Sequence, residues 1–193
     1  TPFSLQIDPT NLCNFKCTFC PWGHPDLLKS VGRPTGMMDY GLFEKIVKDI
    51  KQFDKKIRKI SLYKDGESLM HEKFPQMISH VKNSDVCENI HLTTNGSLLN
   101  KKKSIEIIEA GLDTIRISVE HVHDAGYEAI TQKKFTYEEI KNNVEFLFKE
   151  KSRRGSSLKV HAKLIDTGLS AADQGKFCND FEPISDVLNI FQL

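Results

Sequence analysis

The stretch Thr114-Ile-Arg-Ile-Ser-Val119, together with the two segments that follow it, decides the fold. Polar and apolar residues alternate along it, which predicts a half-buried β-strand. A Thr-x-x-Glu capping box at Thr136 and Glu139 then opens a helix with apolar residues at helical spacing. The stretch Leu158-Lys-Val-His-Ala-Lys-Leu-Ile165 predicts the next strand. Because a strand that returns through a crossover helix pairs in parallel, these segments predict a βαβ unit.

The same alternation of strand and helix patterns continues outward from this unit in both directions. Further strands are expected at 4–8, 59–63, 89–93 and 187–191, and further helices after Asp39, over 74–81, after Asn100 and over 171–181. Six strands separated by five helices fit two architectures, an open doubly wound sheet or a closed or partly closed barrel. Both place ligands at the carboxyl ends of the strands, so the residues that follow each strand are the candidates for function.

The composition is that of an ordinary globular domain and excludes several classes of function. The 193 residues suit one domain, and 27 basic against 26 acidic residues leave a net charge of +1. This balance creates no field that would attract nucleic acid or an anionic membrane, so neither is expected as a partner. The basic runs 101–103 and 151–154 are interpreted as solvated helix ends and loops. No apolar run approaches the roughly 20 residues of a membrane span, and no signal peptide is visible, so a cytoplasmic protein is expected.

Three of the five cysteines, Cys13, Cys17 and Cys20, lie within eight residues directly after the first expected strand. An odd number of cysteines, three of them so closely spaced, favours a metal site over a disulfide scaffold. Three thiolates are informative, because structural zinc sites and electron-transfer clusters are closed by four ligands. A cluster held by three cysteines leaves one iron open to a substrate or cofactor. The alternative is a zinc site in which His24 supplies the fourth ligand.

The motif C-x3-C-x2-C after a first strand, with an aromatic residue before its last cysteine (here Phe19), resembles the signature of the radical S-adenosylmethionine (SAM) superfamily. Three further motifs of that family have counterparts in order, each after or on the expected strand. The segment 64–68 resembles the Gly-Gly-Glu motif, 93–96 resembles a Thr-Asn-Gly segment, and 116–120 resembles an Ile-Ser-Leu-Asp stretch. The resemblance covers essentially the whole chain and implies an α/β fold, a partial (β/α)6 TIM-type barrel with parallel strands.

The resemblance also implies cofactors, chemistry and partners. Cys13, Cys17 and Cys20 would ligate a 4Fe–4S cluster, which reductively cleaves SAM to a 5′-deoxyadenosyl radical that abstracts hydrogen from a substrate. The residues expected to contact SAM are Phe19, Asp65, Gly66, Glu67, Thr94, Asn95, Ser118 and Lys163. A small reductant protein of the flavodoxin or ferredoxin type is the expected electron donor.

The motifs depart from the family pattern at four positions. Asp65 replaces the first glycine of the Gly-Gly-Glu motif. Glu120 and His121 replace the Asp-Gly pair that follows the fourth strand in relatives. Thr131 stands where relatives often carry an arginine that contacts SAM, and Lys163 could supply the positive charge instead.

The sequence leaves the substrate open. One class is a peptide or protein, and the other is a sugar-like small molecule. Activation of a glycyl-radical enzyme is less favoured, because Arg116-Ile-Ser118 stands in place of the Asp-x-Lys pattern of activases. A module that binds zinc or an iron–sulfur cluster without catalysis is the alternative from another class. The chain is interpreted as one domain, 1–193, of an enzyme of the SPASM or twitch type, truncated at its C-terminus because it stops on the sixth strand.

Other side chains support weaker hypotheses. Ile190 and Phe191 fall where relatives pack the adenine of SAM. His121 and His123 would share a face of an extended segment and could bind a metal, although a solvated polar loop is favoured. Trp22 could shield the cluster from water or close the rim of the barrel.

Overall fold

The computed structural model describes residues 1–192, which contain one six-stranded parallel sheet. Its strands are β1 (Ser4–Gln6), β2 (Lys59–Ser61), β3 (Ile90–Thr94), β4 (Thr114–Val119), β5 (Lys159–Asp166) and β6 (Val187–Gln192). Each strand pairs in parallel with the next strand along the chain, so the spatial order follows the sequence. A doubly wound sheet needs the strand order to reverse at a switch point. The sequential order therefore confirms the partial (β/α)6 barrel.

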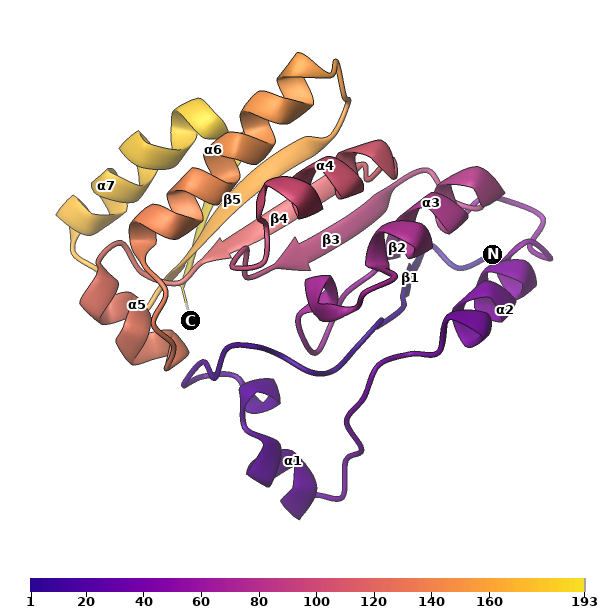
Figure 1. Ribbon diagram of the computed structural model, residues 1–193, viewed down its shortest axis with the longest axis horizontal. Coiled ribbons are helices and arrows are strands. Elements are labelled where there is room, and N and C mark those ends of the chain that lie inside the picture. The colour runs from indigo at the N-terminus through magenta and orange to yellow at the C-terminus, as the bar shows by residue number, and fades with distance from the viewer. Residues whose placement is uncertain (193) are drawn as a thin grey trace.

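Helices pack against one face of this sheet (Figure 1). The α-helices are α1 (Pro25–Ser30), α2 (Tyr40–Ile50), α3 (Phe74–Ser84), α4 (Lys101–Glu109), α5 (Asp124–Thr131), α6 (Tyr137–Arg153) and α7 (Ala171–Phe181), and the 3-10 helices are η1 (Pro21–Gly23), η2 (Ser68–Met70) and η3 (Glu182–Ile184). The expected caps form, because the side chains of Asp39 and Asn100 accept backbone N–H groups and Thr136 closes a capping box with Glu139. No helix within the described part of the chain is long and apolar enough to span a membrane.

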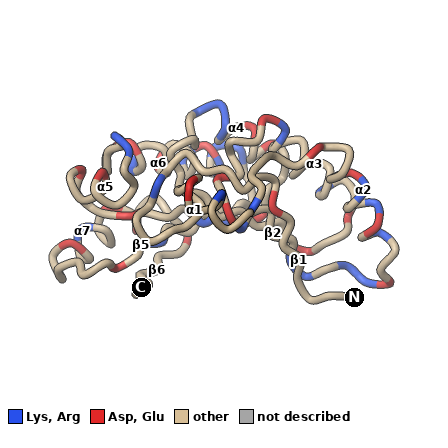
Figure 2. Tube along the Cα trace, turned by 90° about the horizontal axis from the view of Figure 1, so that it is seen from below, with Lys and Arg blue, Asp and Glu red and all other residues tan. Residues whose placement is uncertain are grey.

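The two faces of the sheet carry different kinds of side chain. On β4, Ile115, Ile117 and Val119 are fully buried beneath the helices, and the residues between them are half-buried and polar. The same period of two continues on β5. Seen from below, the chain forms an arch with β1 and the C-terminal end at its two feet (Figure 2). The apolar set thus builds the core beneath the helices, and the polar set lines the inner side of the arch.

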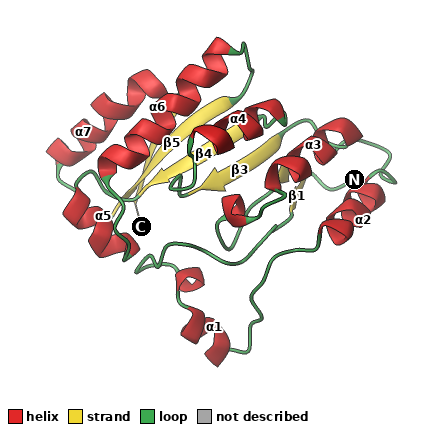
Figure 3. Cartoon of the chain, viewed as in Figure 1, coloured by secondary structure: helices red, strands yellow, loops and turns green. Residues whose placement is uncertain are grey.

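Two helices, α1 and α5, are not predicted by the strand and helix pattern. The helix α1 spans only six residues, begins at a proline and buries a single side chain, so it leaves no periodic signal. Figure 3 shows it on a long excursion of loops between β1 and α2. The bounds of β4 are as predicted, and the other predicted strands differ from the observed ones by one or two residues at an end, where hydrogen bonding rather than composition sets the limit.

Within the basic run 151–154, Lys151 fastens α6 to the sheet, whereas residues 152–154 face solvent. The side chain of Lys151 is buried, donates to a backbone carbonyl at 2.8 Å and pairs with Asp186. The two arginines of the run pair with Glu150. The prediction of a solvated helix end was wrong for Lys151, because its partner is 35 residues away in the sequence.

Candidate active site at the strand ends

A cavity of about 300 Å³ lies at the carboxyl ends of the strands. Its lining comes from the loops that follow β1, β2 and β3 and from the ends of β4 and β5. The lining includes Cys13, Cys17 and Cys20 and, of the expected SAM contacts, Phe19, Gly66, Glu67, Thr94, Asn95, Ser118 and Lys163. Segments far apart in the sequence therefore meet at one site, where a barrel of parallel strands is expected to place its ligands.

The three clustered thiols are free and half-buried in this cavity. Burial raises the pKa of Cys13 to about 11 and holds the pKa of Cys17 well above its ordinary range. The ligands of a metal centre are thiolates, and a bound cation supplies the charge that stabilises them. Cys13 and Cys17 therefore stay protonated until a cationic centre binds.

Backbone hydrogen bonds hold the cysteine loop against α5. The N–H of Lys16 donates to the carbonyl of Thr131 at 2.9 Å, and the N–H of Thr18 donates to the carbonyl of Ile130 at 3.0 Å. The hydroxyl of Thr131 is buried and donates to the carbonyl of Tyr127 at 2.8 Å. Thr131 thus supports the cysteine loop and brings no positive charge to the cavity.

Gly66 allows the loop after β2 to touch the chain just before Cys13. A Cβ atom at Gly66 would lie 2.3 Å from the carbonyl oxygen of Leu12 and 2.7 Å from that of Thr10. The N–H of Glu67 donates to the same carbonyl of Leu12 at 2.8 Å. Only glycine tolerates so close an approach of two backbones, so Gly66 sets the distance between the two loops.

The carboxylate of Glu67 is buried and engaged by donors of the protein. Its Oε1 accepts the hydroxyl of Thr94 at 2.8 Å and the N–H of Leu69 at 3.0 Å, and its Oε2 accepts the N–H of Asn95 at 2.8 Å. These bonds brace the loop after β3 against η2. The free acceptors of the loop after β2 are the backbone carbonyls of 64–66, since no backbone N–H within residues 1–192 donates to them.

Asp65 is the one expected SAM contact that lies outside the cavity lining. Its carboxylate forms an ion pair with Arg33 at 2.8 Å. The guanidinium of Arg33 in turn lies over the ring of Trp22, 4.2 Å from its centroid. The side chain of Asp65 therefore anchors the excursion that carries α1, and the expected SAM contact is left to its backbone carbonyl. Trp22 covers Arg33 and does not line the cavity.

Asn95 links the loop after β3 to the cysteine loop. Its amide donates to Asn14 Oδ1 at 2.9 Å and approaches Cys13 Sγ at 3.9 Å. Asn14 donates to Ser97 Oγ at 2.8 Å, and the hydroxyl of Ser97 donates to Asn95 Oδ1 at 2.7 Å. Sequence reasoning missed Asn14, because its role depends on a partner 81 residues away. Its place between two metal-ligand candidates was the only available signal.

Ser118 and Lys163 are paired across β4 and β5 and both line the cavity. The Nζ of Lys163 lies 5.2 Å from the centroid of the Phe191 ring, so the lysine points inward and not to the surface. Burial lowers the pKa of Lys163, whereas Glu120 acts to raise it. A hydroxyl and an ammonium thus stand side by side on the inner face, a pair of donors for an anionic or hydroxylated ligand.

Glu120 is a cavity residue that sequence reasoning noted only as a replacement in a motif. It is 5% exposed, and its Oε2 has no hydrogen-bond partner within residues 1–192. Burial raises the pKa of Glu120 to about 7, and Lys163 opposes this rise. Thr93 Oγ1 is a second buried atom of the same cavity without a partner in the described chain. Such atoms are rare in folded proteins, so both indicate that a bound molecule completes the site.

Apolar side chains line the rest of the cavity. They are Phe15, which is buried, Phe19, which is partly exposed, and Ile165 at the end of β5. Ile190 and Phe191, which were expected to pack the adenine, lie outside the lining. Ile165 is the apolar residue that β5 offers at this edge of the cavity.

The alternative zinc site with His24 does not form. The Nε2 of His24 lies 3.2 Å from the carbonyl oxygen of Cys17, and the ring lines a separate cavity. Within residues 1–192, no three His, Cys, Asp or Glu side chains are gathered so as to hold a single metal ion. The rings of His121 and His123 have centroids 5.7 Å apart, and His123 pairs with Asp173 at 2.6 Å, so a metal at these histidines stays a prediction.

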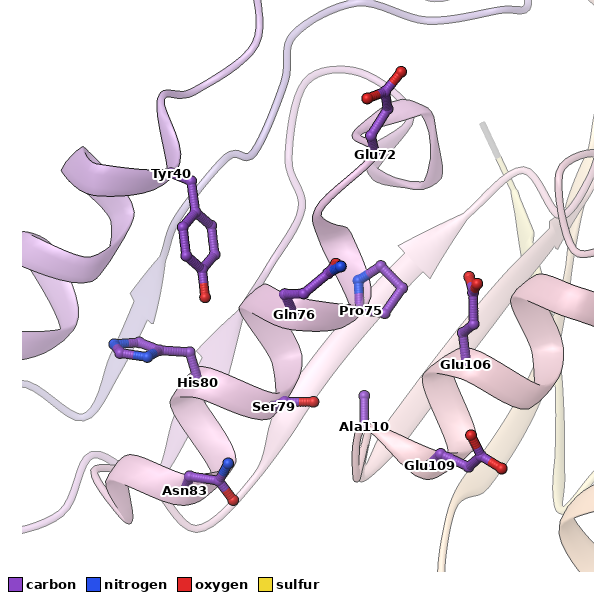
Figure 4. Close-up of a pocket in the computed structure, with 10 residues that line it drawn as sticks. All are labelled: Tyr40, Glu72, Pro75, Gln76, Ser79, His80, Asn83, Glu106, Glu109 and Ala110. Carbon is purple, nitrogen blue, oxygen red and sulfur yellow. The ribbon is translucent and has the colours of Figure 1, made fainter.

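A larger cavity of about 490 Å³ lies on the helical side of the sheet (Figure 4). It is bordered by α3 and α4 and by Tyr40 of α2, which points toward the ring of His80. None of its lining residues is a cysteine or an expected site residue. Its volume alone therefore does not make it the active-site candidate.

Comparison with known families gives one match that covers most of the chain. The model described as "Radical SAM superfamily" matches residues 7–161. This span begins before the cysteine loop and reaches into β5. It contains every residue that lines the 300 Å³ cavity except Lys163 and Ile165.

Individual relatives are longer than this chain. A "Probable GTP 3',8-cyclase" of Methanococcus maripaludis is 34% identical over 132 residues, which are 67% of this chain and 39% of the relative. The structure "Native anSMEcpe with bound AdoMet and Kp18Cys peptide" aligns with a TM-score of 0.73 at 18% identity, covering 100% of this chain and 51% of that one. "BtrN in complex with AdoMet and 2-DOIA" aligns with a TM-score of 0.57 at 16% identity, covering 99% and 57%. At these identities the two solved structures show a shared fold alone.

Proposed function

Because the chain belongs to the radical SAM superfamily, we propose that it is an enzyme that abstracts hydrogen from its substrate and that residues 1–193 form its core domain. The cofactors of this superfamily are a 4Fe–4S cluster and SAM. When bound, they supply a one-electron cleavage of SAM that yields a 5′-deoxyadenosyl radical, which takes a hydrogen atom from the substrate. The observation that carries the proposal is one cavity that gathers three thiols with orphaned buried acceptors.

Cys13, Cys17 and Cys20 are proposed as the ligands of the cluster. They come from one loop, line one cavity and have no disulfide partner. Gly66 and Asn95 fix the position of this loop, through the backbone contact at Leu12 and the amide bond to Asn14. The chain thus orients the cluster by loop-to-loop contacts and not by a fourth protein ligand.

The SAM contacts are proposed among the other residues that line the cavity. The free backbone carbonyls of 64–66 would accept hydrogen bonds from an ammonium group. Lys163 and Ser118 would donate to a carboxylate or to ribose hydroxyls. The unpartnered Oε2 of Glu120 is a further acceptor for a hydroxyl in the same cavity. Phe19 and Ile165 offer apolar surface for a base.

The substrate is proposed to be a peptide or a sugar-like small molecule. The relative named as a GTP cyclase is consistent with a small-molecule substrate, and the two solved neighbours, which share only the fold, were determined with a peptide and with 2-DOIA. A flavodoxin- or ferredoxin-type protein is proposed as the electron donor. Each of these assignments concerns the whole enzyme, and the chain spans less than two fifths of the cyclase.

Formation of 5′-deoxyadenosine tests the proposal. The protein is reconstituted anaerobically with iron and sulfide, reduced with dithionite and incubated with SAM, and the product is quantified by chromatography. Wild-type protein should form 5′-deoxyadenosine, and Cys17→Ala should lose it together with the brown cluster chromophore. Cys178→Ala is the matched control, because this free thiol lies outside the cavity and should leave both readouts unchanged. Tight stoichiometric zinc without a brown chromophore in the wild type would instead support a non-catalytic metal module.

A further inference from the structure

A second layer of polar side chains continues the inner face of the sheet inward from the cavity, whose lining already includes Thr93 and Tyr63. Thr93 of β3, Arg116 of β4 and His161 of β5 are partners in the strand register and so lie side by side. Ser118 and Lys163 occupy the next inward-facing positions toward the strand ends. Two residues of a strand span roughly 6.6 Å, so the Arg116 layer sits about one side chain deeper than the proposed SAM contacts. Arg116 and His161 do not line the cavity itself.

This layer carries positive charge without a matching carboxylate. Arg116 is half-buried and donates one hydrogen bond, to the hydroxyl of Tyr63 at 3.1 Å. No carboxylate within residues 1–192 forms an ion pair with Arg116, His161 or Lys163. The nearby acids do not pair with Arg116: Asp186 pairs with Lys151, and Glu120 lines the cavity together with Lys163. A partly desolvated guanidinium with unused donors is costly unless an anion completes it.

Two buried polar atoms next to Arg116 also lack partners. The ring of His91 is 7% exposed, and its Nε2 has no hydrogen-bond partner in the described chain. The ring stands edge to face against Tyr63, with centroids 5.2 Å apart. Thr93 Oγ1, in register with Arg116, is the second such atom. Arg116 also depresses the pKa of His91, to about 4, after the larger effect of burial. The layer thus combines a net positive field with unused polar atoms.

We propose that Arg116, with Tyr63, Thr93 and His161, binds an oxyanion of the substrate, a phosphate or a carboxylate, inside the arch of the sheet. The guanidinium fork supplies parallel donors that match the oxygens of either group. The hydroxyls and imidazoles around it supply further donors from neighbouring strands. This inference rests on the proposed function, because it assigns the charged end of the substrate in the same barrel. Lys163, one layer higher, is left to the carboxylate of SAM.

Anion-dependent thermal unfolding tests the inference without reference to SAM cleavage. The melting temperature of the reconstituted protein is measured in inorganic phosphate, in acetate and in chloride of equal ionic strength, with and without saturating SAM. An anion that binds only the folded state stabilises it in proportion to its occupancy. Phosphate or acetate should raise the melting temperature above the chloride value, and the effect should persist with SAM present. The anion that acts identifies the oxyanion class.

Matched variants assign the effect to this layer. Arg116→Gln should weaken the stabilising anion at least about tenfold, as expected for a lost charge-assisted contact, and Arg116→Lys should recover part of it. Arg58→Gln is the control, because this arginine is exposed and pairs with Glu88 on the surface. If Arg116→Gln does not fold, His161→Gln provides the same comparison with a smaller loss.

Three results would overturn the inference. One is the absence of any phosphate or acetate effect on wild-type protein. Another is an effect that Arg116→Gln and His161→Gln leave unchanged. The third is an effect that SAM abolishes and that only Lys163→Gln removes, since the anion would then occupy the site of the SAM carboxylate. Failure of the proposed function looks different, because 5′-deoxyadenosine would be absent while the dependence on Arg116 remained.

Discussion

The two faces of β4 and β5 carry side chains of opposite character. Outward residues such as Ile117 and Leu164 are fully buried against helices. Inward residues such as Arg116, Ser118 and Lys163 are half-buried, polar and only partly satisfied. One strand therefore serves stability on one face and ligand binding on the other. Adjacent positions on these strands should therefore respond to substitution differently, the outward ones in stability and the inward ones in ligand binding.

The largest contrast is expected between Ile117 and Ser118. Ile117→Ala should lower the free energy of unfolding by about 2–5 kcal/mol, because it removes fully buried methylene groups and leaves a cavity. Ser118→Ala should change it by less than about 0.5 kcal/mol and weaken SAM binding by about fivefold, the cost of one hydrogen bond of about 1 kcal/mol. Urea unfolding and equilibrium dialysis with SAM measure the two effects. Equal destabilisation by both variants would contradict the division of the faces.

The next effect concerns Glu120, which is buried on the inner side without a partner for Oε2. The folded-state pKa of about 7 lies above the ordinary value of 4.5, so the folded protein holds this proton more tightly. The free energy of unfolding should therefore fall as pH rises from about 4.5 to about 7, by roughly 3 kcal/mol at most.

Glu120→Gln should remove this fall and be more stable than wild type at pH 8. Thermal unfolding of the cluster-free protein between pH 4 and pH 8 measures the difference. Parallel pH profiles for the two proteins would show that Glu120 is not held in a desolvated position.

A smaller contrast is expected between Thr93 and Thr94, which face opposite sides of β3. The hydroxyl of Thr94 donates to Glu67 at 2.8 Å and accepts the N–H of Gly96 at 3.0 Å. Thr94→Val should therefore cost about 1–2 kcal/mol of folding free energy. Thr93→Val removes an unpartnered hydroxyl and should be neutral or slightly stabilising. Chemical unfolding of the two variants measures the difference, and a larger loss of stability in Thr93→Val than in Thr94→Val would refute the assignment of faces.

The smallest effect is expected at Arg33, which holds the excursion outside the sheet. Its side chain is 52% exposed where it pairs with Asp65. Asp65 is only 10% exposed and would lose its partner, so Arg33→Gln should cost about 1 kcal/mol, the upper end of the range for exposed ion pairs. Faster proteolysis within 21–39 would be the more sensitive sign that the excursion is released. Lys45→Gln, which breaks another surface pair, is the matched control.

Local patterns predicted much of the fold, and long-range contacts explain what they missed. The caps at Asp39, Asn100 and Thr136 are visible in the sequence because each joins residues three positions apart. Alternation alone could not choose between a doubly wound sheet and a partial barrel, because it does not say which strands are neighbours. The strand order settles that choice.

The same distinction applies to the site. Motif spacing and resemblance selected the three cysteines and seven expected SAM contacts, all of which line one cavity. They did not predict that Asp65 pairs with Arg33, that Asn14 bonds to Asn95, or that protein donors engage the carboxylate of Glu67. Each of these contacts joins loops at least 27 residues apart. Which partner each of these side chains contacts depends on how the loops pack together, and the neighbouring residues in the sequence do not reveal it.

Electron paramagnetic resonance of the reduced, iron-loaded protein tests the central claim most directly, because it reports on the cluster and on SAM in one sample. Iron analysis of the same sample should give about four irons per chain. The reduced-cluster signal should change when SAM is added, and it should be lost in Cys13→Ala, Cys17→Ala and Cys20→Ala. A cluster signal that SAM leaves unchanged, or wild-type protein that loads no cluster at all, would contradict the central claim.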